Sequence, residues 1–205
     1  MANQQHLEIL QQGVKNWNRW RSENPQQRPD LAEADLSKAD LRGALLAYVN
    51  LTAARLWEAN LMWANLGGAN LHQTDLRRAK CRGANLIWTN LGGANLTDTD
   101  LTGANLSDAN LFGASLGRAV LAGANLREAD LGWANLQGAI LSHARLSLAS
   151  LRDAVLAGVD LRAVDLSNAR NLTTQQIGRA YGGRDTKLPE GLERPVQWLK
   201  VVEEA

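Results

Sequence analysis

Leucine recurs at every fifth position from Leu31 to Leu166 without a single break in register. Of these 28 positions, 27 are leucine and the remaining one is Cys81. A small residue, usually alanine as at Ala34 and Ala39, stands two positions before each of them, so the repeated unit reads A-(D/N)-L-x-x. An internal period of this kind decides the architecture before any local secondary structure is assigned.

A period of five fits neither a helix nor a strand. On an α-helix each step of five turns the side chain by about 140°, which would scatter the leucines around the axis. In a strand every second leucine would face the opposite side. The chain must therefore turn a corner in every unit, so that the leucines and the small residues all point to one axis. Glycine, which tolerates turn conformations, recurs at the last position of the unit at Gly43, Gly68, Gly83, Gly93, Gly103, Gly113, Gly123, Gly138 and Gly158.

The units Ala84-Asn85-Leu86, Ala94-Asn95-Leu96 and Ala104-Asn105-Leu106, with their many neighbours, resemble the pentapeptide-repeat family over about residues 29–170. The resemblance implies an all-β fold, a right-handed quadrilateral parallel β-solenoid with four units in each coil. By that count the 28 units would form about seven coils. The closing segment of the chain is similar to that of some bacterial, especially cyanobacterial, members.

Both ends of a solenoid expose its core and unpaired backbone, so each end requires a cap. Leu7, Leu10, Val14 and Trp17 recur at steps of three and four residues, which predicts an amphipathic α-helix in the N-terminal cap. Residues from Thr173 to Tyr181 are predicted to form a short helix begun by a threonine cap, followed by an extended tail. The expected domains are an N-terminal helical cap (1–28), the solenoid (29–170) and a C-terminal cap and tail (171–205).

Charge and composition exclude several classes of protein. The net charge is +1, from 22 basic and 21 acidic residues, so no electrostatic footprint for nucleic acid is present. The start of the chain has no signal-peptide pattern, and no apolar run is long enough for a membrane span, so we expect a cytoplasmic protein without membrane contact. One cysteine excludes an internal disulfide.

The sequence offers no candidate for catalysis. Cys81 occupies a leucine position and is expected to be a buried small hydrophobe rather than a nucleophile. His6, His72 and His143 lie too far apart in register to converge, and no spacing resembles a zinc site. We therefore expect no enzymatic activity, no cofactor-binding residues and no metal site.

Large apolar side chains at the two variable positions after leucine should lie outside the core. Exposed aromatic residues and methionine are typical of binding surfaces. They predict a partner-binding surface formed by Tyr48, Trp57, Met62, Trp63, Ile87, Trp88 and Phe112. Alternatively, the N-terminal helix folds down over some of these side chains, or they shield corners without a partner.

Residues 20 apart should lie directly above one another. Lys38, Glu58, Arg78, Asp98 and Arg118 then alternate in sign along one column, which predicts a ladder of ion pairs with a stabilising role. Two further columns are rich in asparagine and predict side-chain amides hydrogen-bonded from coil to coil: Asn50, Asn70, Asn90 and Asn110 in one, Asn65, Asn85, Asn105 and Asn125 in the other.

The leading hypothesis is a non-enzymatic scaffold that binds an unidentified protein partner, with homodimer formation left open. The alternative comes from the family resemblance, because some members modulate type II topoisomerase (DNA gyrase) as mimics of DNA. That mechanism needs a dense negative surface, whereas residues 29–170 carry 13 basic and 14 acidic side chains. A third hypothesis, direct nucleic-acid binding, is disfavoured because Arg77, Arg78, Lys80 and Arg82 should point to different sides of a solenoid.

Overall fold

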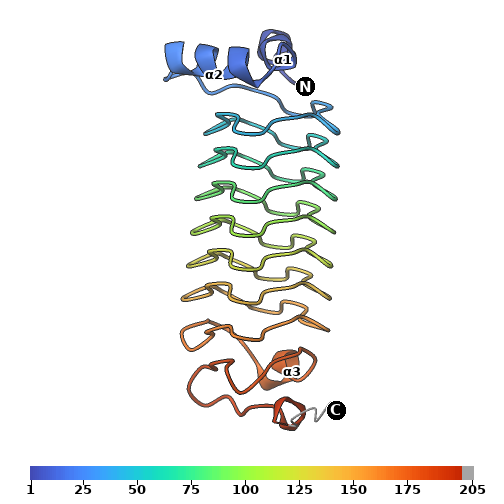
Figure 1. Cartoon of the computed structure of the whole chain (residues 1–205), viewed down its shortest axis with the longest axis vertical. Coiled ribbons are helices and arrows are strands. Elements are labelled where there is room, and N and C mark those ends of the chain that lie inside the picture. The colour runs from blue at the N-terminus through green and yellow to red at the C-terminus, as the bar shows by residue number, and fades with distance from the viewer. Residues whose placement is uncertain (200–205) are drawn as a thin grey trace, which may run out of the picture.

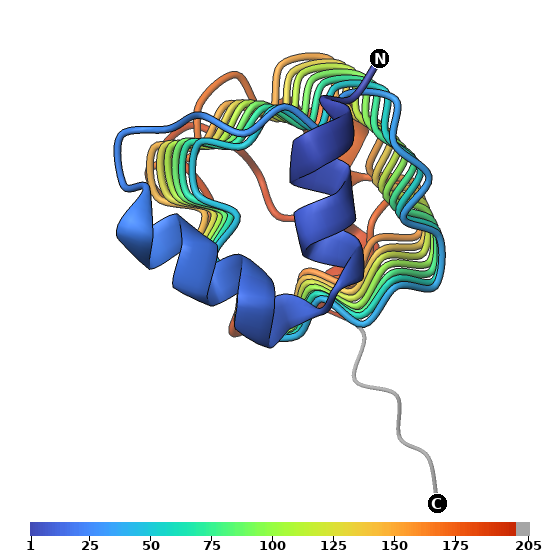
Figure 2. The same ribbon diagram turned by 90° about the horizontal axis from the view of Figure 1, so that it is seen from above.

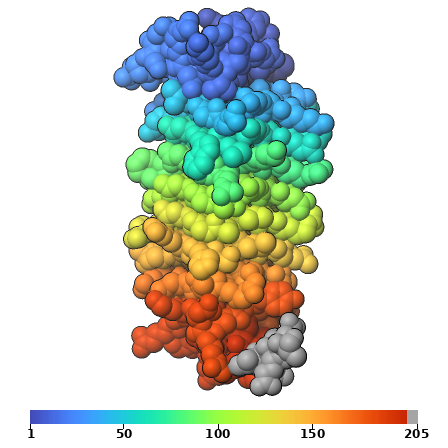
Figure 3. Space-filling view, viewed as in Figure 1, coloured from blue at the N-terminus to red at the C-terminus, as the bar shows by residue number. Residues whose placement is uncertain are grey.

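The computed structural model describes residues 1–199 of the chain as an elongated rod. Two helices, α1 (Gln4–Gln11) and α2 (Val14–Glu23), lie across one end of the rod (Figure 1). A stack of coils follows, and the other end carries the short helix α3 (Thr174–Ile177) and a 3-10 helix, η1 (Val196–Trp198). Side chains fill the outline from one end to the other (Figure 3).

The coils are joined by parallel β-bridges with a constant offset of 20 residues. The bridges begin with Asp30 and Asn50 and continue at every fifth position to Ser150 and Arg170. Within residues 1–199 each bridge is an isolated pair, so the sides of the rod consist of single bridging positions rather than longer strands. Seen along the axis, successive coils superimpose in a four-sided outline (Figure 2). The chain is a β-solenoid.

Each corner is a tight turn with one residue in the left-handed region. The N–H of the small residue donates to the carbonyl of the preceding leucine, as from Ala34 to Leu31 (3.1 Å). The residue just before the small one has a φ near +60°, for example +66° at Gly43 and +60° at Lys38, as position three of a type II turn requires. We number the corners by their two outer residues: corner 1 at 32–33, corner 2 at 37–38, corner 3 at 42–43 and corner 4 at 47–48, each repeating every 20 residues.

Leucine and alanine fill the interior of the rod as the repeat predicts. The repeat leucines at every fifth position from Leu46 to Leu166 are at most 2% exposed, and Cys81 takes its place among them at 1%. Threonine replaces alanine at a few inner positions, where burying the hydroxyl would be costly without a partner. Thr74 and Thr99 solve this by donating to the leucine carbonyls of the preceding coil, at 2.8 Å and 2.7 Å.

The N-terminal segment forms two helices, where the leucine spacing predicted one. Gly13, the N-cap of α2, has a φ of +102°, so the chain changes direction between the two helices. A residue with a side chain rarely adopts that conformation, which is why the break falls at a glycine. Trp17 is fully buried beneath α2, and its Nε1 donates to the carbonyl of Leu45 in the first coil (2.9 Å).

At the other end the chain departs gradually from the repeat. Thr173 and Gln176 form a reciprocal capping box at the start of α3, which confirms the predicted threonine cap, although the helix ends at Ile177. Two further bridges, Asp160 with Tyr181 and Asp165 with Lys187, extend the stack beyond the last full coil. Residues 200–205 of the predicted C-terminal tail lie outside the described part of the chain. Among the described residues, no helix has the length and apolar character needed to cross a membrane.

Candidate interaction surface

The seven side chains predicted to bind a partner all lie outside the core. Trp57, Met62 and Ile87 are partly buried. The other four are at least half exposed: Tyr48 (53%), Trp63 (62%), Trp88 (61%) and Phe112 (50%). The helices α1 and α2 lie across the open end and leave these side chains uncovered, because their polar contacts are to residues 30–47 of the first coil.

These seven residues do not form one patch, because the register distributes them over all four corners. Trp57 lies on corner 2 and Phe112 on corner 1. Met62 and Trp63 lie on corner 3, whereas Tyr48, Ile87 and Trp88 lie on corner 4. The predicted contiguous surface is therefore reduced to the five residues of corners 3 and 4, which border one shared face of the rod. We call this face 3–4; it carries residues 44–46 and each set 20 further on.

Glycines make room for the exposed rings on face 3–4. The ring of Tyr48 lies over Gly68, and the ring of Trp63 lies over Gly83, so that a methyl group on either glycine would collide with the ring. Each ring thus extends along the rod toward the next coil. Between the two corners, Asn85 donates its amide to Asn65 (3.0 Å), which presents a polar strip flanked by aromatic rings.

Three of these aromatic residues occupy the left-handed position of their turn. Tyr48 and Trp63 have φ of +59° and Trp88 has +57°. In other coils the same position of these two corners is occupied by Gly68, Gly83 and Gly103. An L-residue in this region costs roughly 1 kcal/mol relative to glycine. The chain therefore carries bulky aromatic residues at turn positions where glycine, which other coils use, would be less strained.

Sequence reasoning left Trp133 out of the candidate surface. It is 59% exposed with a φ of +57° and lies on corner 1, one coil beyond Phe112. Phe112 itself packs against the position that a side chain on Gly132 would occupy. Counting in steps of 20 would have placed these two aromatic residues on one corner, far from Trp63 and Trp88.

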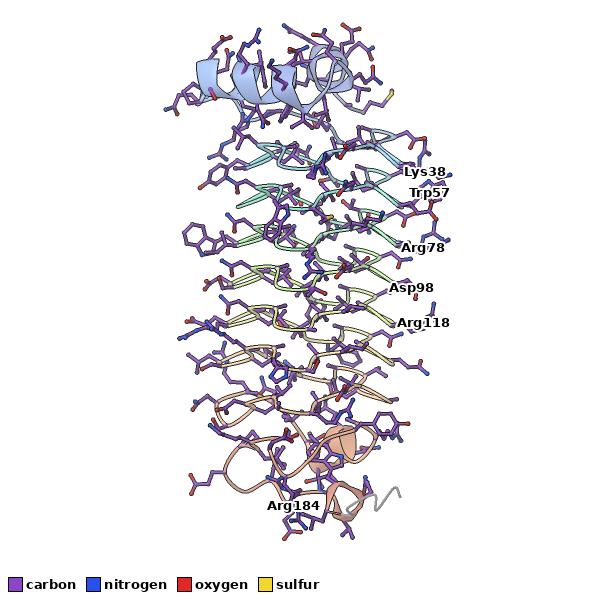
Figure 4. All side chains as sticks on the ribbon, viewed as in Figure 1. Lys38, Trp57, Arg78, Asp98, Arg118 and Arg184 are labelled. Atoms are coloured by element: carbon purple, nitrogen blue, oxygen red, sulfur yellow. The ribbon has the colours of Figure 1, made fainter. Side chains whose placement is uncertain are left out.

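Corner 2 carries the predicted ladder of charges (Figure 4). Ion pairs form three of its four steps, from Lys38 to Glu58 (3.9 Å), Glu58 to Arg78 (2.9 Å) and Asp98 to Arg118 (2.7 Å), whereas Arg78 and Asp98 do not pair. Hydrogen bonds from Arg118 hold the pKa of Asp98 below its usual value. The Nζ of Lys38 lies 4.6 Å from the ring centroid of Trp57, so this tryptophan belongs to the charged column rather than to an apolar patch.

The asparagine columns form the predicted coil-to-coil hydrogen bonds only in part. Asn90 donates to Asn70 (3.1 Å) and Asn110 to Asn90 (3.2 Å). Asn70 instead donates to the hydroxyl of Thr52 (2.9 Å), which interrupts the column. In most coils the amide oxygen also accepts the N–H two residues on, as Asn65 does from Gly67, and thereby supports the next turn.

Groups with catalytic potential are either buried or dispersed. Burial raises the pKa of the Cys81 thiol to about 12, so the thiol is neutral and enclosed. Across residues 1–199, no three His, Cys, Asp or Glu side chains come together in a group that could hold a metal ion.

Comparison with known proteins identifies the repeat. The family model described as pentapeptide repeats matches in eight copies, over residues 30–56, 44–80, 79–118, 104–142 and 129–168. A search for curated relatives found no match.

Among solved structures, a trypsin-treated form of QnrB1, a plasmid-mediated fluoroquinolone resistance protein, has a TM-score of 0.69 at 20% identity, over 80% of this chain and 83% of that chain. A second trypsin-treated form reaches 0.67 at 21% identity, over 76% and 77%. A pentapeptide repeat protein of the Arabidopsis thaliana thylakoid lumen is 33% identical over 47% of this chain and 68% of that one, with a TM-score of 0.47. The likeness to QnrB1 shows the fold alone, a right-handed β-solenoid.

Proposed function

The chain belongs to the pentapeptide-repeat family, and from this premise we propose that it is a non-enzymatic scaffold that binds a protein partner through face 3–4. In this proposal the scaffold is a rigid rod of about seven coils over residues 29–170. Residues 1–28 and 171–205 act as its caps, and the protein works in the cytoplasm.

The observation that carries the proposal is the pair of exposed tryptophans on face 3–4. Trp63 and Trp88 stand at left-handed positions on the two corners that border this face, and both are about three-fifths exposed. Tryptophan is strongly enriched among the residues that dominate binding energy at interfaces. A ring fixed on a rigid corner also loses little conformational freedom when it binds.

The rest of face 3–4 suits a protein partner. Tyr48 and Ile87 extend the apolar area along corner 4, and Met62 extends it along corner 3. The amides of Asn65 and Asn85 between them can exchange hydrogen bonds with a polypeptide. Interfaces commonly combine an apolar centre with a modest number of such polar contacts.

The test compares two double variants that each remove two exposed aromatic side chains, from different corners. Trp63→Gly with Trp88→Gly introduces a residue that already stands at these corners in neighbouring coils, such as Gly83 and Gly68, so the fold should persist. The matched control, Phe112→Gly with Trp133→Gly, does the same on corner 1.

Each protein would be immobilised and exposed to lysate of the native host, and the captured proteins would be identified by mass spectrometry. The proposal expects a partner held by the intact protein and by the corner 1 control but lost from the face 3–4 variant. Equal capture by all three proteins would contradict it. Sedimentation of the purified proteins would distinguish a homodimer, which should also dissociate in the face 3–4 variant.

The alternative function, modulation of DNA gyrase by DNA mimicry, is disfavoured by charge. The repeat carries 13 basic and 14 acidic side chains, and corner 2 alternates in sign instead of presenting a negative column. Supercoiling assays with purified gyrase test this alternative directly, since a mimic should inhibit or protect the enzyme at stoichiometric concentration.

A further inference from the structure

Face 3–4 carries no acidic side chain in its first three coils. Residues 42–48, 62–68 and 82–88 make up this part of the face with its two corners, and their only charged side chains are Arg42 and Arg82. Each of the other three faces bears a carboxylate in its first coil, at Asp30, Asp35 and Asp40. A partner that docks on face 3–4 therefore meets positive charge and no negative charge, which favours a partner that supplies hydrogen-bond acceptors.

The polar strip in the middle of the face offers mainly N–H groups. The Oδ1 of Asn65 accepts two hydrogen bonds, from the N–H of Gly67 (3.1 Å) and from the amide of Asn85 (3.0 Å), so both of its lone pairs are engaged. The next residue of this column toward the N-terminus is Leu45, whose side chain has no acceptor for the Nδ2 of Asn65. The amide of Asn65 is thus left with N–H groups to donate to a partner.

The backbone of face 3–4 is not free to pair with an added strand. The N–H of Leu46 bonds to the carbonyl of Asn65 (2.7 Å), and the N–H of Asn65 bonds to the carbonyl of Ala44 (2.9 Å). One coil further, Leu66 bonds to Asn85 in the same way (2.7 Å). Strand addition requires an exposed sheet edge, and a solenoid has such edges only at its two ends. A partner on this face must therefore be recognised by side chains.

The aromatic residues of face 3–4 alternate between its two corners with a defined spacing. Tyr48 and Trp88 lie on corner 4, two coils apart, and Trp63 lies on corner 3 in the coil between them. Because neighbouring coils are separated by about 4.8 Å, positions two coils apart are separated by about 9.6 Å. One turn of a polyproline II helix, which contains three residues, rises about 9.3 Å. Residues i and i+3 of such a segment, lying along the rod, would meet Tyr48 and Trp88, and the residues between them would meet Trp63.

A proline-rich segment also has the hydrogen-bonding character that the strip requires. Proline has no backbone N–H, and the polyproline II helix forms no internal hydrogen bonds, so its carbonyls are available as acceptors. An extended segment of other residues would bring N–H groups that lose their water without gaining an acceptor, which costs free energy. Aromatic-lined grooves are the general means by which proteins bind polyproline II segments.

We propose that the partner of face 3–4 presents a proline-rich segment in the polyproline II conformation, which lies along the rod between corners 3 and 4. Tyr48, Trp63 and Trp88 pack against the proline rings, and the amide of Asn65 donates to a carbonyl of the segment. This class of partner rests on the proposed function and narrows it. The segment is already extended before it binds, so little conformational freedom is lost on either side of the contact.

The test titrates the ¹⁵N-labelled full-length protein with a synthetic decaproline peptide and follows the indole N–H signals by NMR. The signals of Trp63 and Trp88 should shift together and saturate, whereas the signal of Trp133, which is about as exposed on corner 1, should stay in place. A glycine–serine peptide of the same length should cause no saturable shift, because it is flexible and has no proline rings. Absence of binding by decaproline, or equal binding of the two peptides, would overturn the proposal.

Two double variants test whether the rings of face 3–4 are required. Trp63→Gly with Trp88→Gly should weaken the binding of decaproline by at least about tenfold, measured on the side-chain amide signals of Asn85. Phe112→Gly with Trp133→Gly, on corner 1, should leave the affinity unchanged. Equal weakening in both variants would mean that the peptide binds exposed aromatic residues wherever they lie, and the proposal would fail.

The variant Asn65→Leu tests the donor strip separately. Leucine already stands in this column at Leu45, so the replacement is compatible with the repeat. The affinity for decaproline should fall by about threefold to tenfold, the effect of one lost hydrogen bond. The matched control, Asn90→Leu, removes an amide from the column of face 4–1 and should have no effect on binding. Unchanged affinity in Asn65→Leu would contradict the assignment of this amide as a donor to the segment.

The results also distinguish this class of partner from the proposed function itself. If capture from lysate depends on Trp63 and Trp88 but decaproline does not bind, face 3–4 binds a partner of another structure, such as an amphipathic helix, and only the proline-rich class is refuted. If capture is independent of both tryptophans, the proposed function fails and the proline-rich class fails with it.

Discussion

The two ends of the rod are each closed by a buried tryptophan, but they reach this arrangement differently. At the N-terminal end Trp17 donates from Nε1 to the carbonyl of Leu45 (2.9 Å), and at the C-terminal end Trp198 donates to Ala180 at the same distance. Trp17 is fully buried and Trp198 is 5% exposed. Both close the core with one large ring and satisfy one backbone carbonyl.

The difference lies in what satisfies the remaining backbone groups. At the N-terminal end side chains of α2 do so: Asn18 bonds to Gly43 and Leu45, and Arg21 bonds to Ala47. At the C-terminal end the chain itself continues the ladder irregularly through Tyr181 and Lys187. The bridges of the first coil all join residues 20 apart, whereas Asp160 pairs with Tyr181 and Asp165 with Lys187, 21 and 22 residues further on. A separate helix thus caps the solenoid without distorting its repeat, whereas the chain that continues from the last coil departs from the repeat.

Replacing Trp17 by alanine should have the largest effect. The change removes a fully buried ring and its hydrogen bond, so the free energy of unfolding should fall by about 3–5 kcal/mol, measured by urea denaturation. Trp63→Ala, at an exposed corner, serves as the control and should change stability by less than about 1 kcal/mol. Similar losses in both variants would mean that α2 does not close the core.

Trp198→Ala should have a smaller and more local effect. We expect a loss of about 2–3 kcal/mol, together with faster amide exchange at residues 180–187 and unchanged exchange in the middle of the rod. Repeat structures unravel from their ends because each unit contacts only its neighbours. If amide exchange became faster by the same factor along the whole rod, Trp198 would stabilise the entire solenoid and not its C-terminal end alone.

Asn18→Ala should remove one helix-to-coil connection without emptying the core. Asn18 donates to the carbonyl of Gly43 (3.0 Å) and accepts from the N–H of Leu45 (2.8 Å), and both groups would lose a partner. The expected cost is about 1–2 kcal/mol in urea denaturation. Asn16→Ala, in the same helix but bonded only to Gln12 within the N-terminal segment, should cost markedly less.

Lowering the pH should destabilise the C-terminal end of the rod first, and this is the smallest of the four predicted effects on stability. Hydrogen bonds from Ser167 and Lys187 lower the pKa of Asp165 to about 2, below its unfolded value, so its contribution is present near neutral pH and is lost as pH falls toward 2. Because the pair is exposed, Asp165→Asn should remove only about 0.5 kcal/mol at pH 7 and flatten the acid dependence of stability. Asp108→Asn is the charge-matched control, and an identical flattening there would refute the assignment.

The sequence alone predicted the repeat, its core and the ladder of corner 2, because each follows from local spacing. A leucine at every fifth position leaves one way to bury all leucines, and the offset of 20 then aligns Glu58 with Arg78. The break at Gly13 was missed because the apolar spacing runs through it without interruption. Gly13 was the signal that the sequence offered, because its φ of +102° suits glycine, and Trp17 then holds α2 on the first coil by its hydrogen bond to Leu45.

The candidate site was predictable only in part. That Trp63 and Trp88 are exposed follows from their position in the unit, but assigning them to corners 3 and 4 required counting each residue within its coil. Whether the tryptophans bind a partner stays a prediction.

The direction of the inter-coil hydrogen bonds also has a mechanical consequence. These bonds run along the axis of the rod, from each coil to the next, so a force pulling the two ends apart would load every bond of one level at once. The levels with complete ladders share that load over all four sides. Beyond residue 170 the chain leaves the repeat and meets the stack at Tyr181 and Lys187, so fewer bonds share the load there and under tension the rod should open first at this end.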